Sequence, residues 1–300
     1  MYSRLFHLHT LSALHCGTGQ SVGVVDLPIA RARATQLPIV PGSSLRGVLR
    51  QELQAKDAAL TNALFGPRKI ESNDQSFAGA LAVGDAHLLV LPVRALAGIL
   101  CYATSPFILT RYARDLRAAG IEPPQMPVNP PSGERALVVP QSANLMPGTQ
   151  TLVLEELDLQ GAGEGHTQEW AEFIAARIHP TDEEVRKDFS SRFAILPDNI
   201  LGFLAETATE LRTRISIDEQ TGTVKKGALW FEEHLPAEAL LWGVYALSES
   251  RVKGEPQTPE ALEQGLHKTL EGEHEYLLQL GGQAGVGRGL VRLLAAEVPA

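Results

Sequence analysis

Residues 15–50 read HCGTGQSVGVVDLPIARARATQLPIVPGSSLRGVLR, and this stretch decides how the rest of the chain is interpreted. It starts with a histidine among glycines, contains a single acid, Asp26, and ends in a segment that carries arginines. The glycines and prolines up to residue 42 predict a long loop. Apolar residues then recur at helical spacing, so Ser43 or Ser44 is expected to cap a helix.

Hydrophobic periodicity and turn residues divide the chain into short elements of both kinds. We expect strands over 3–14, within 79–94, and over 98–104, 136–140, 151–159 and 290–298. We expect helices over 43–56, 105–119, 167–178, 181–211, 236–247 and 258–279, and a hairpin with strands 214–217 and 224–231. Such interleaving predicts an α+β fold, most simply a ferredoxin-like (RRM-type) sheet with insertions.

Length and composition narrow the class of protein. A chain of 300 residues suits one elaborated domain or two. Cys16 and Cys101 form neither a disulfide framework nor a metal-ligand set, which fits a reducing cytoplasm. A run of about 18 apolar residues is missing from the sequence, so we expect no membrane span.

Charge is spread unevenly along the chain, whose net charge is −9. Residues 1–50 carry five arginines against the single acid Asp26, whereas residues 151–185 carry nine acids against Arg177 alone. An acidic body with one basic face fits a protein that meets RNA on one side. Composition alone favours an ordinary acidic cytoplasmic protein.

Two residues of the opening stretch carry groups suited to RNA cleavage. The Asp26 carboxylate could bind a divalent ion or help to deprotonate a ribose 2′-hydroxyl. An aspartate before Leu-Pro is also a common turn residue. The imidazole of His15 could bind phosphate or protonate the leaving 5′-oxygen, although a lone histidine is more often a structural residue.

Three further motifs suit RNA binding. The start of the helix, with Ser43, Ser44 and Arg46, offers backbone N–H groups, hydroxyls and a charge to an anion. The hairpin carries Lys225, Lys226 and Trp230, which could grip a backbone or stack on a base. The glycine loop 281–289, with Gly285, Gly287 and Arg288, is neither a dinucleotide fingerprint nor a P-loop.

These motifs together resemble one family. His15-x-Gly17, Val25-Asp26-Leu27-Pro28, residues 41–47, residues 214–236 and the glycine loop are similar to the backbone subunit of the type III-B (Cmr) CRISPR effector complex. That subunit is a RAMP-superfamily protein that binds guide RNA and cuts target RNA. About a third of the chain carries the resemblance, and the intervening segments match only in their succession of elements.

The resemblance implies a fold and a set of roles. It implies a ferredoxin-like palm over 1–159 and 236–300, and an inserted lid and thumb over 160–235. Asp26 would be the target-cleavage residue, with Mg or Mn as the divalent ion. The residues of the three motifs would contact RNA, with Ser43, Ser44 and Arg46 against guide-RNA phosphates. Copies of the chain would stack head to tail with other subunits along one guide, whose pairing with the target selects the sequence.

Three other functions remain open at this point. A guide-processing RAMP endonuclease shares the fold and the glycine loop but usually relies on a histidine. A structural RNA-binding subunit without chemistry is a second alternative, and the type III-A (Csm) backbone subunit is a related candidate. An unrelated phosphate-binding enzyme is disfavoured by the position of the glycine loop.

Overall fold

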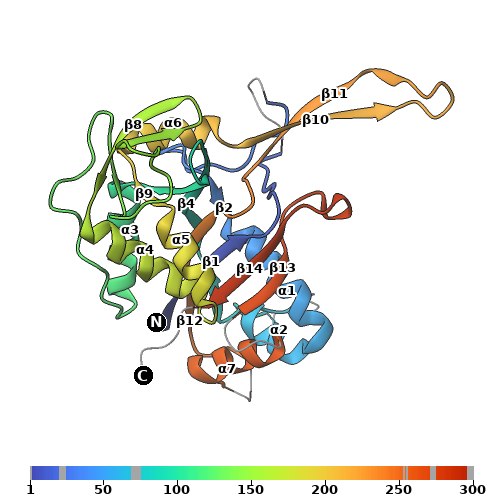
Figure 1. The fold of residues 1–300 in the computed structure, drawn as a ribbon. Coiled ribbons are helices and arrows are strands. Elements are labelled where there is room, and N and C mark those ends of the chain that lie inside the picture. The colour runs from blue at the N-terminus through green and yellow to red at the C-terminus, as the bar shows by residue number, and fades with distance from the viewer. Residues whose placement is uncertain are drawn as a thin grey trace.

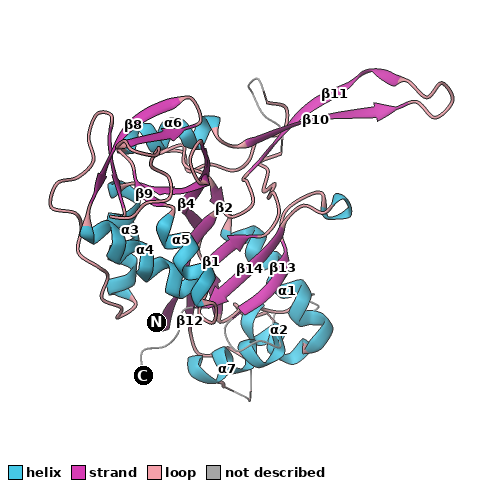
Figure 2. Ribbon diagram, viewed as in Figure 1, coloured by secondary structure: helices cyan, strands magenta, loops and turns pink. Residues whose placement is uncertain are grey.

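A mixed sheet runs through the molecule with helices on both sides, and a two-stranded hairpin projects from it (Figures 1 and 2). The computed structural model describes residues 2–19, 25–68, 76–252, 254, 256–270 and 275–295. The α+β class expected from the sequence is confirmed. In the described part of the chain, no helix has the length and apolar character that a membrane span requires.

The elements follow one another in mixed order along the chain. The helices are α1 (Gly42–Lys56), α2 (Ala58–Phe65), α3 (Pro106–Ala118), α4 (Gly165–Ile178), α5 (Glu183–Ser191), α6 (Asp198–Thr207) and α7 (Pro259–Leu270), and η2 (Ala284–Val286) is a 3-10 turn. The strands of the first half are β1 (Tyr2–Thr10), β2 (Ile39–Val40), β3 (Leu81–Val83), β4 (Ala86–Ala95), β5 (Ile99–Thr104), β6 (Arg135–Val138), β7 (Thr151–Leu154) and β8 (Leu157–Gly163). The remaining strands are β9 (Phe193–Ile195), β10 (Glu210–Ile217), β11 (Val224–His234), β12 (Leu240–Leu247), β13 (Glu275–Gln279) and β14 (Leu290–Ala295).

The sheet is centred on β1 and β12. Its order is β13-β14-β1-β12-β4-β5-β9-β6-β8-β7, and each pair from β13 to β5 is antiparallel. Helices α1 and α2 follow β1 in the chain, and α7 connects β12 to β13. The hairpin β10–β11 forms a separate sheet, and its far end stands clear of the body (Figure 1).

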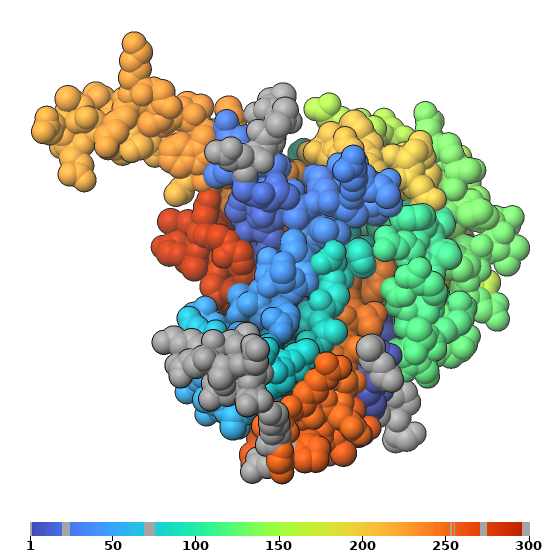
Figure 3. Space-filling view, turned by 180° about the vertical axis from the view of Figure 1, so that it is seen from behind, coloured from blue at the N-terminus to red at the C-terminus, as the bar shows by residue number. Residues whose placement is uncertain are grey.

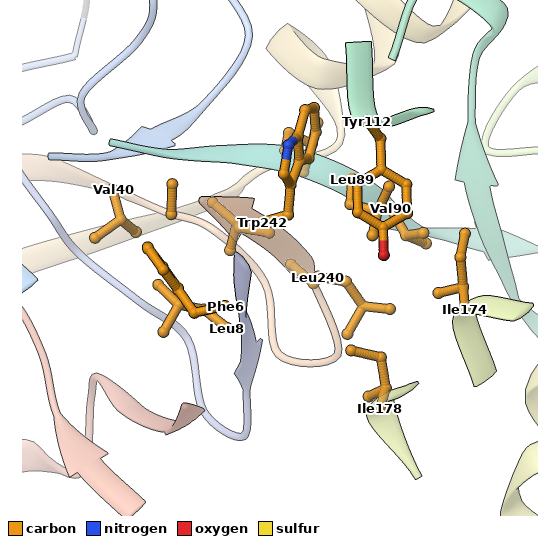
Figure 4. Close-up of a cluster of buried hydrophobic side chains, with 14 of the residues drawn as sticks. Phe6, Leu8, Val40, Leu89, Val90, Tyr112, Ile174, Ile178, Leu240 and Trp242 are labelled. Atoms are coloured by element: carbon orange, nitrogen blue, oxygen red, sulfur yellow. The ribbon is translucent and has the colours of Figure 1, made fainter. Parts of the chain in front are cut away.

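Both faces of the central sheet are covered. Phe6 of β1 packs with Leu45 and Leu49 of α1 on one face. On the other face, Tyr112 of α3 contacts the ring of Trp242 in β12, with the ring centroids 5.4 Å apart. Figure 4 shows these two sides of the core meeting around the central strands.

Strand β12 corrects the helix expected over 236–247. Residues Leu240–Leu247 instead pair with β1 on one side and with β3 and β4 on the other. A central strand that is buried on both faces is apolar almost throughout, so it lacks the alternation that distinguishes a strand from a buried helix.

Three other expected elements are divided in the structure. The helix over 181–211 is wrong at its centre, because the fully buried segment Phe193–Ile195 pairs with β5 and β6 between α5 and α6. The helix over 258–279 ends at Leu270, and its last part is the strand β13. The strand over 151–159 is two strands joined by a turn at Glu155, whose φ is 48°.

The start of α1 also differs from the expectation that a serine caps it. The N-cap is Pro41, which makes no side-chain capping hydrogen bond. The Gly42 N–H instead donates to Asp85 Oδ1 at 2.8 Å, so an aspartate from the turn before β4 supplies the acceptor. A Cβ at Gly42 would lie 2.5 Å from the Val83 carbonyl oxygen, which explains the glycine at this position.

The remaining expectations agree with the structure to within a few residues. Confirmed elements are the helices over 43–56, 105–119 and 167–178, the hairpin, and the strands within 79–94 and over 98–104 and 136–140. The first strand ends at Thr10 rather than residue 14, and the last is described up to Ala295.

We expect Trp242→Ala to lower the free energy of unfolding by about 3–5 kcal/mol, the usual cost of removing a fully buried aromatic side chain. The indole is 1% exposed and also donates from Nε1 to Asp115 Oδ2 at 3.1 Å. Guanidinium unfolding measures the change. Trp230→Ala on the hairpin is the control and should cost less than half as much, so equal losses would contradict this account of the core.

Candidate active site

Three segments that are distant in the sequence meet at the base of the hairpin. They are the loop 25–31, residues 230–234 of β11, and the glycine loop 281–289 (Figure 1). Figure 3 shows residues from the first part of the chain, in blue, beside the base of the orange hairpin. Residues 20–24 of the opening stretch lie outside the described residues.

The loop that carries Asp26 pairs with β11. The Leu27 N–H donates to the Phe231 carbonyl at 3.1 Å, and the Glu233 N–H donates to the Leu27 carbonyl at 2.9 Å. Asp26 is exposed, and its Oδ2 accepts the Phe231 N–H at 2.8 Å. One carboxylate oxygen is therefore anchored to the backbone while the side chain stays open to solvent.

His15 is attached to the same strand. Its Nδ1 lies 2.7 Å from the Glu233 carbonyl oxygen, and because a carbonyl only accepts, Nδ1 carries the proton. The Gly282 N–H donates to the His15 carbonyl at 2.9 Å. Gly281 has φ 71°, and a Cβ there would lie 2.2 Å from that carbonyl oxygen, so the glycine allows the close approach.

Glu232 joins the hairpin to the glycine loop. Its side chain is buried and accepts hydrogen bonds from Trp230 Nε1 at 2.7 Å and from Gln283 Nε2, with Arg214 Nε at 3.7 Å. Burial favours the neutral acid, but the donors from Gln283 and Trp230 and the Arg214 charge outweigh it and hold the pKa of Glu232 below its ordinary value.

His234 follows Glu232 and Glu233 in β11 and is fully buried. Burial lowers the pKa of His234, and the nearby charges of His15, Arg288 and Arg212 lower it further, although Glu232 opposes them. Its ring centroid is 5.4 Å from that of His15. His234 was not predictable as a site residue, because one histidine at the end of a strand carries no recognisable sequence pattern.

Arg31 follows Asp26 closely in the sequence, and its side chain is turned inward. Its guanidinium binds Glu233 Oε1 at 2.5 Å and donates to the carbonyls of Gln36 and Ala205. Arg33 of the same loop is exposed. Of these two arginines, Arg33 has the side chain that is open to a ligand.

The predicted RNA-binding residues lie in three places. Ser43 is exposed and Ser44 half-buried in the first turn of α1, while Arg46 donates to the Phe65 carbonyl at 2.9 Å. Lys225 and Lys226 are exposed on the hairpin, and Trp230 is half-buried near its base. Gly285, Gly287 and Arg288 belong to the loop around η2. Among the described residues, hydrogen bonds join the hairpin base to the Asp26 loop, and Gln283 joins the glycine loop to the hairpin base.

The side chains around Asp26 determine how a divalent ion could be bound there. Among the described residues, no three histidine, cysteine or acidic side chains are grouped to hold a metal. Mg²⁺ usually binds through one or two carboxylates together with water and substrate phosphate rather than in an all-protein cage. An exposed carboxylate such as Asp26 fits that mode of binding.

Comparisons with known proteins, by sequence and by structure, each match nearly the whole chain. The model of the RAMP superfamily matches residues 7–292. The CRISPR system Cmr endoribonuclease Cmr4 of Pyrococcus furiosus is 34% identical over 303 residues, covering 99% of this chain and 97% of that protein. The crystal structure of oligomeric Cmr4 from the same organism covers both chains fully with a TM-score of 0.75 at 27% identity.

A more distant structure shares the fold. One chain of the type III-B Cmr-beta complex bound to cognate target RNA, solved by cryo-electron microscopy, has a TM-score of 0.72 at 18% identity. The match covers 98% of this chain and 97% of that one. At this identity the likeness concerns the fold alone.

The lowered pKa of Glu232 predicts a pH-dependent contribution to stability. A carboxylate whose pKa is depressed in the folded state stabilises the fold above the unfolded pKa, and the stabilisation is lost as pH falls through the folded value. We therefore expect Glu232→Gln to be less stable than the wild type at neutral pH, and the difference to shrink below the ordinary pKa of 4.5. Chemical unfolding at a series of pH values measures it. A difference that grows on acidification would contradict the assignment.

Proposed function

The chain belongs to the RAMP superfamily, and from that premise we propose that it is the repeating backbone subunit of a type III-B CRISPR ribonucleoprotein that binds guide RNA and cuts target RNA. The observation that carries the proposal is the exposed Asp26 carboxylate, held by the Phe231 N–H at the base of a projecting hairpin. The likeness to a Cmr endoribonuclease over nearly the whole of both chains supports it.

The reaction that suits this site is internal transesterification. The 2′-oxygen of a target nucleotide attacks the adjacent phosphorus, the P–O5′ bond breaks, and the products are a 2′,3′-cyclic phosphate and a 5′-hydroxyl. Asp26 orients the 2′-hydroxyl and accepts its proton. His15, whose Nδ1 is fixed by the Glu233 carbonyl, supplies a proton to the leaving 5′-oxygen. A divalent ion, Mg or Mn, held by Asp26 would neutralise charge on the phosphate.

The RNA-binding surface that we propose combines the exposed and basic groups near this site. Lys225, Lys226 and Trp230 on the hairpin contact the guide–target duplex. Gly285, Gly287 and Arg288 bring backbone amides and one charge to the phosphates. The first turn of α1, with Ser43, Ser44 and Arg46, binds guide phosphate through its N–H groups and hydroxyls.

We also propose a division of the chain into a palm and an insertion. The palm comprises 1–159 and 236–300 and is ferredoxin-like, which the antiparallel order β14-β1-β12-β4 supports because it is the order of two interleaved β-α-β units. Residues 160–235 form the lid and thumb. We place the complex in the cytoplasm, in keeping with two buried free cysteines.

Assembly along the guide would be head to tail. The tip of the hairpin points away from strand β8 and helix α6 in Figures 1 and 3, and side chains of β8 and α6 line a groove. One face of the hairpin is apolar and exposed, with Ile215 47% and Leu229 54% exposed as a cross-strand pair. The groove is lined by apolar side chains of β8 and α6, Leu157, Leu159, Ile200 and Phe203, together with the acids Glu134, Glu156 and Asp158 and with Asn199. We propose that the apolar hairpin face of one copy lies in this groove of the next, which makes an open chain rather than a closed dimer.

Asp26→Asn should abolish target cutting by that subunit while guide binding, target binding and assembly stay unchanged, because the amide can still accept the Phe231 N–H but is a poor base. Reconstituted complexes with guide and labelled target measure both properties. The matched control is Asp198→Asn, since Asp198 is also exposed and its Oδ1 accepts the Phe107 N–H at 2.9 Å. Equal loss of binding and cutting in Asp26→Asn would show a structural role instead.

Cysteine cross-linking tests the head-to-tail contact. Cys16 and Cys101 are buried, so new cysteines at Leu229 and Phe203 should dominate the reaction. A chain carrying both should form a ladder of multimers on guide RNA, because the two sites belong to different copies. Leu229→Cys combined with Val128→Cys, at a site 79% exposed on another surface, is the control. A ladder with the control pair, or a single dimer band with the first pair, would rule the contact out.

A further inference from the structure

Glu233 connects the Asp26 loop to the hairpin through a buried carboxylate. The residue is 5% exposed. Its Oε2 accepts the Ile29 N–H at 3.1 Å, and its Oε1 binds Arg31 at 2.5 Å and accepts the Thr209 hydroxyl at 3.0 Å. One side chain therefore holds the loop, the strand β11 and the start of β10.

Arg31 extends this connection to α6. Besides Glu233, its guanidinium donates to the Gln36 carbonyl at 2.8 Å and to the Ala205 carbonyl, in the last turn of α6, at 2.9 Å. The Arg31 side chain is 16% exposed and that of Glu233 7%. Removing one partner of a buried pair leaves the other charge uncompensated, so neither residue can be lost without a change in the loop.

The neighbouring glutamates act on different segments. Successive side chains of a strand point to opposite faces. Glu232 accordingly binds Gln283 of the glycine loop, whereas Glu233 binds Ile29 and Arg31 of the Asp26 loop. The backbone pairing of Leu27 with β11 lies between Asp26 and the Ile29 contact, so Glu233 fixes the loop just beyond the proposed cleavage residue.

We propose that Glu233 is a positioning residue that keeps Asp26 in register with β11 and thereby sets the rate of target cutting. This inference rests on the function proposed above for Asp26. Without the carboxylate, the Ile29 N–H and the Arg31 guanidinium lose their acceptor, and the loop can shift along the hairpin. A displacement of about 1 Å at a reacting group can cost about 100-fold in rate.

The test compares Glu233→Ala and Glu233→Gln with Glu263→Ala. Glu263 is a matched control, because it is 7% exposed, accepts the hydroxyls of Tyr2 and Tyr245, and lies 3.6 Å from Arg4. Amide hydrogen exchange of Leu27 and Ile29 in the full chain without RNA measures the loop. Single-turnover cutting and target affinity of the reconstituted complex measure its consequence.

We expect Glu233→Ala to speed exchange at Leu27 and Ile29 by about tenfold and to slow cutting by at least about tenfold, with target affinity unchanged. Glu233→Gln should recover part of both, because its amide oxygen can still accept the Ile29 N–H. Glu263→Ala should change neither. If Glu233→Ala does not fold, Glu233→Gln carries the comparison.

Unchanged exchange at Leu27 and Ile29, or cutting that falls no further than in Glu263→Ala, would overturn the proposal. A wild-type complex that does not cut its target would refute the proposed function instead. The exchange measurement would still report whether Glu233 holds the loop.

Discussion

The site depends on the pairing of one short loop with the base of the hairpin. Leu27 exchanges two backbone hydrogen bonds with β11, so the loop runs beside it as an added strand. Without this pairing, Asp26 would be a solvent-exposed turn residue with no fixed relation to His15. These backbone bonds give the loop its register on β11, and the Glu233 side chain, which accepts the Ile29 N–H, holds the loop beside them.

Two buried acids of β11, Glu232 and Glu233, bind the segments on either side of this pairing. Glu232 faces the glycine loop and Glu233 faces the Asp26 loop, and each has an arginine within reach. Buried carboxylates are costly unless donors surround them, and here the donors come from segments that are distant in the sequence. The electrostatic demand of the two acids therefore helps to bring three distant segments together.

Much of the fold was predictable from local patterns, and the site was predictable only in part. Amphipathic helices such as α1, α3 and α4 show their period in the sequence, but β12 does not, because both of its faces are buried. Asp26, His15 and the hairpin were each identifiable by residue type. Their meeting across about 200 residues was not, since non-local pairing leaves no periodic signal. Glu233 was missed as well, because a glutamate in an alternating strand is expected to be solvent-exposed. Its burial depends on partners that are distant in the sequence.

The central claim is that Asp26 lies against the target nucleotide whose bond is cut. Disulfide capture tests it most directly, with Asp26→Cys in the reconstituted complex and target RNAs that carry a tethered thiol at successive positions. The account predicts capture at the cleaved nucleotide and little at positions two or more nucleotides away. Capture that is uniform along the target, or that peaks away from the cut, would contradict it.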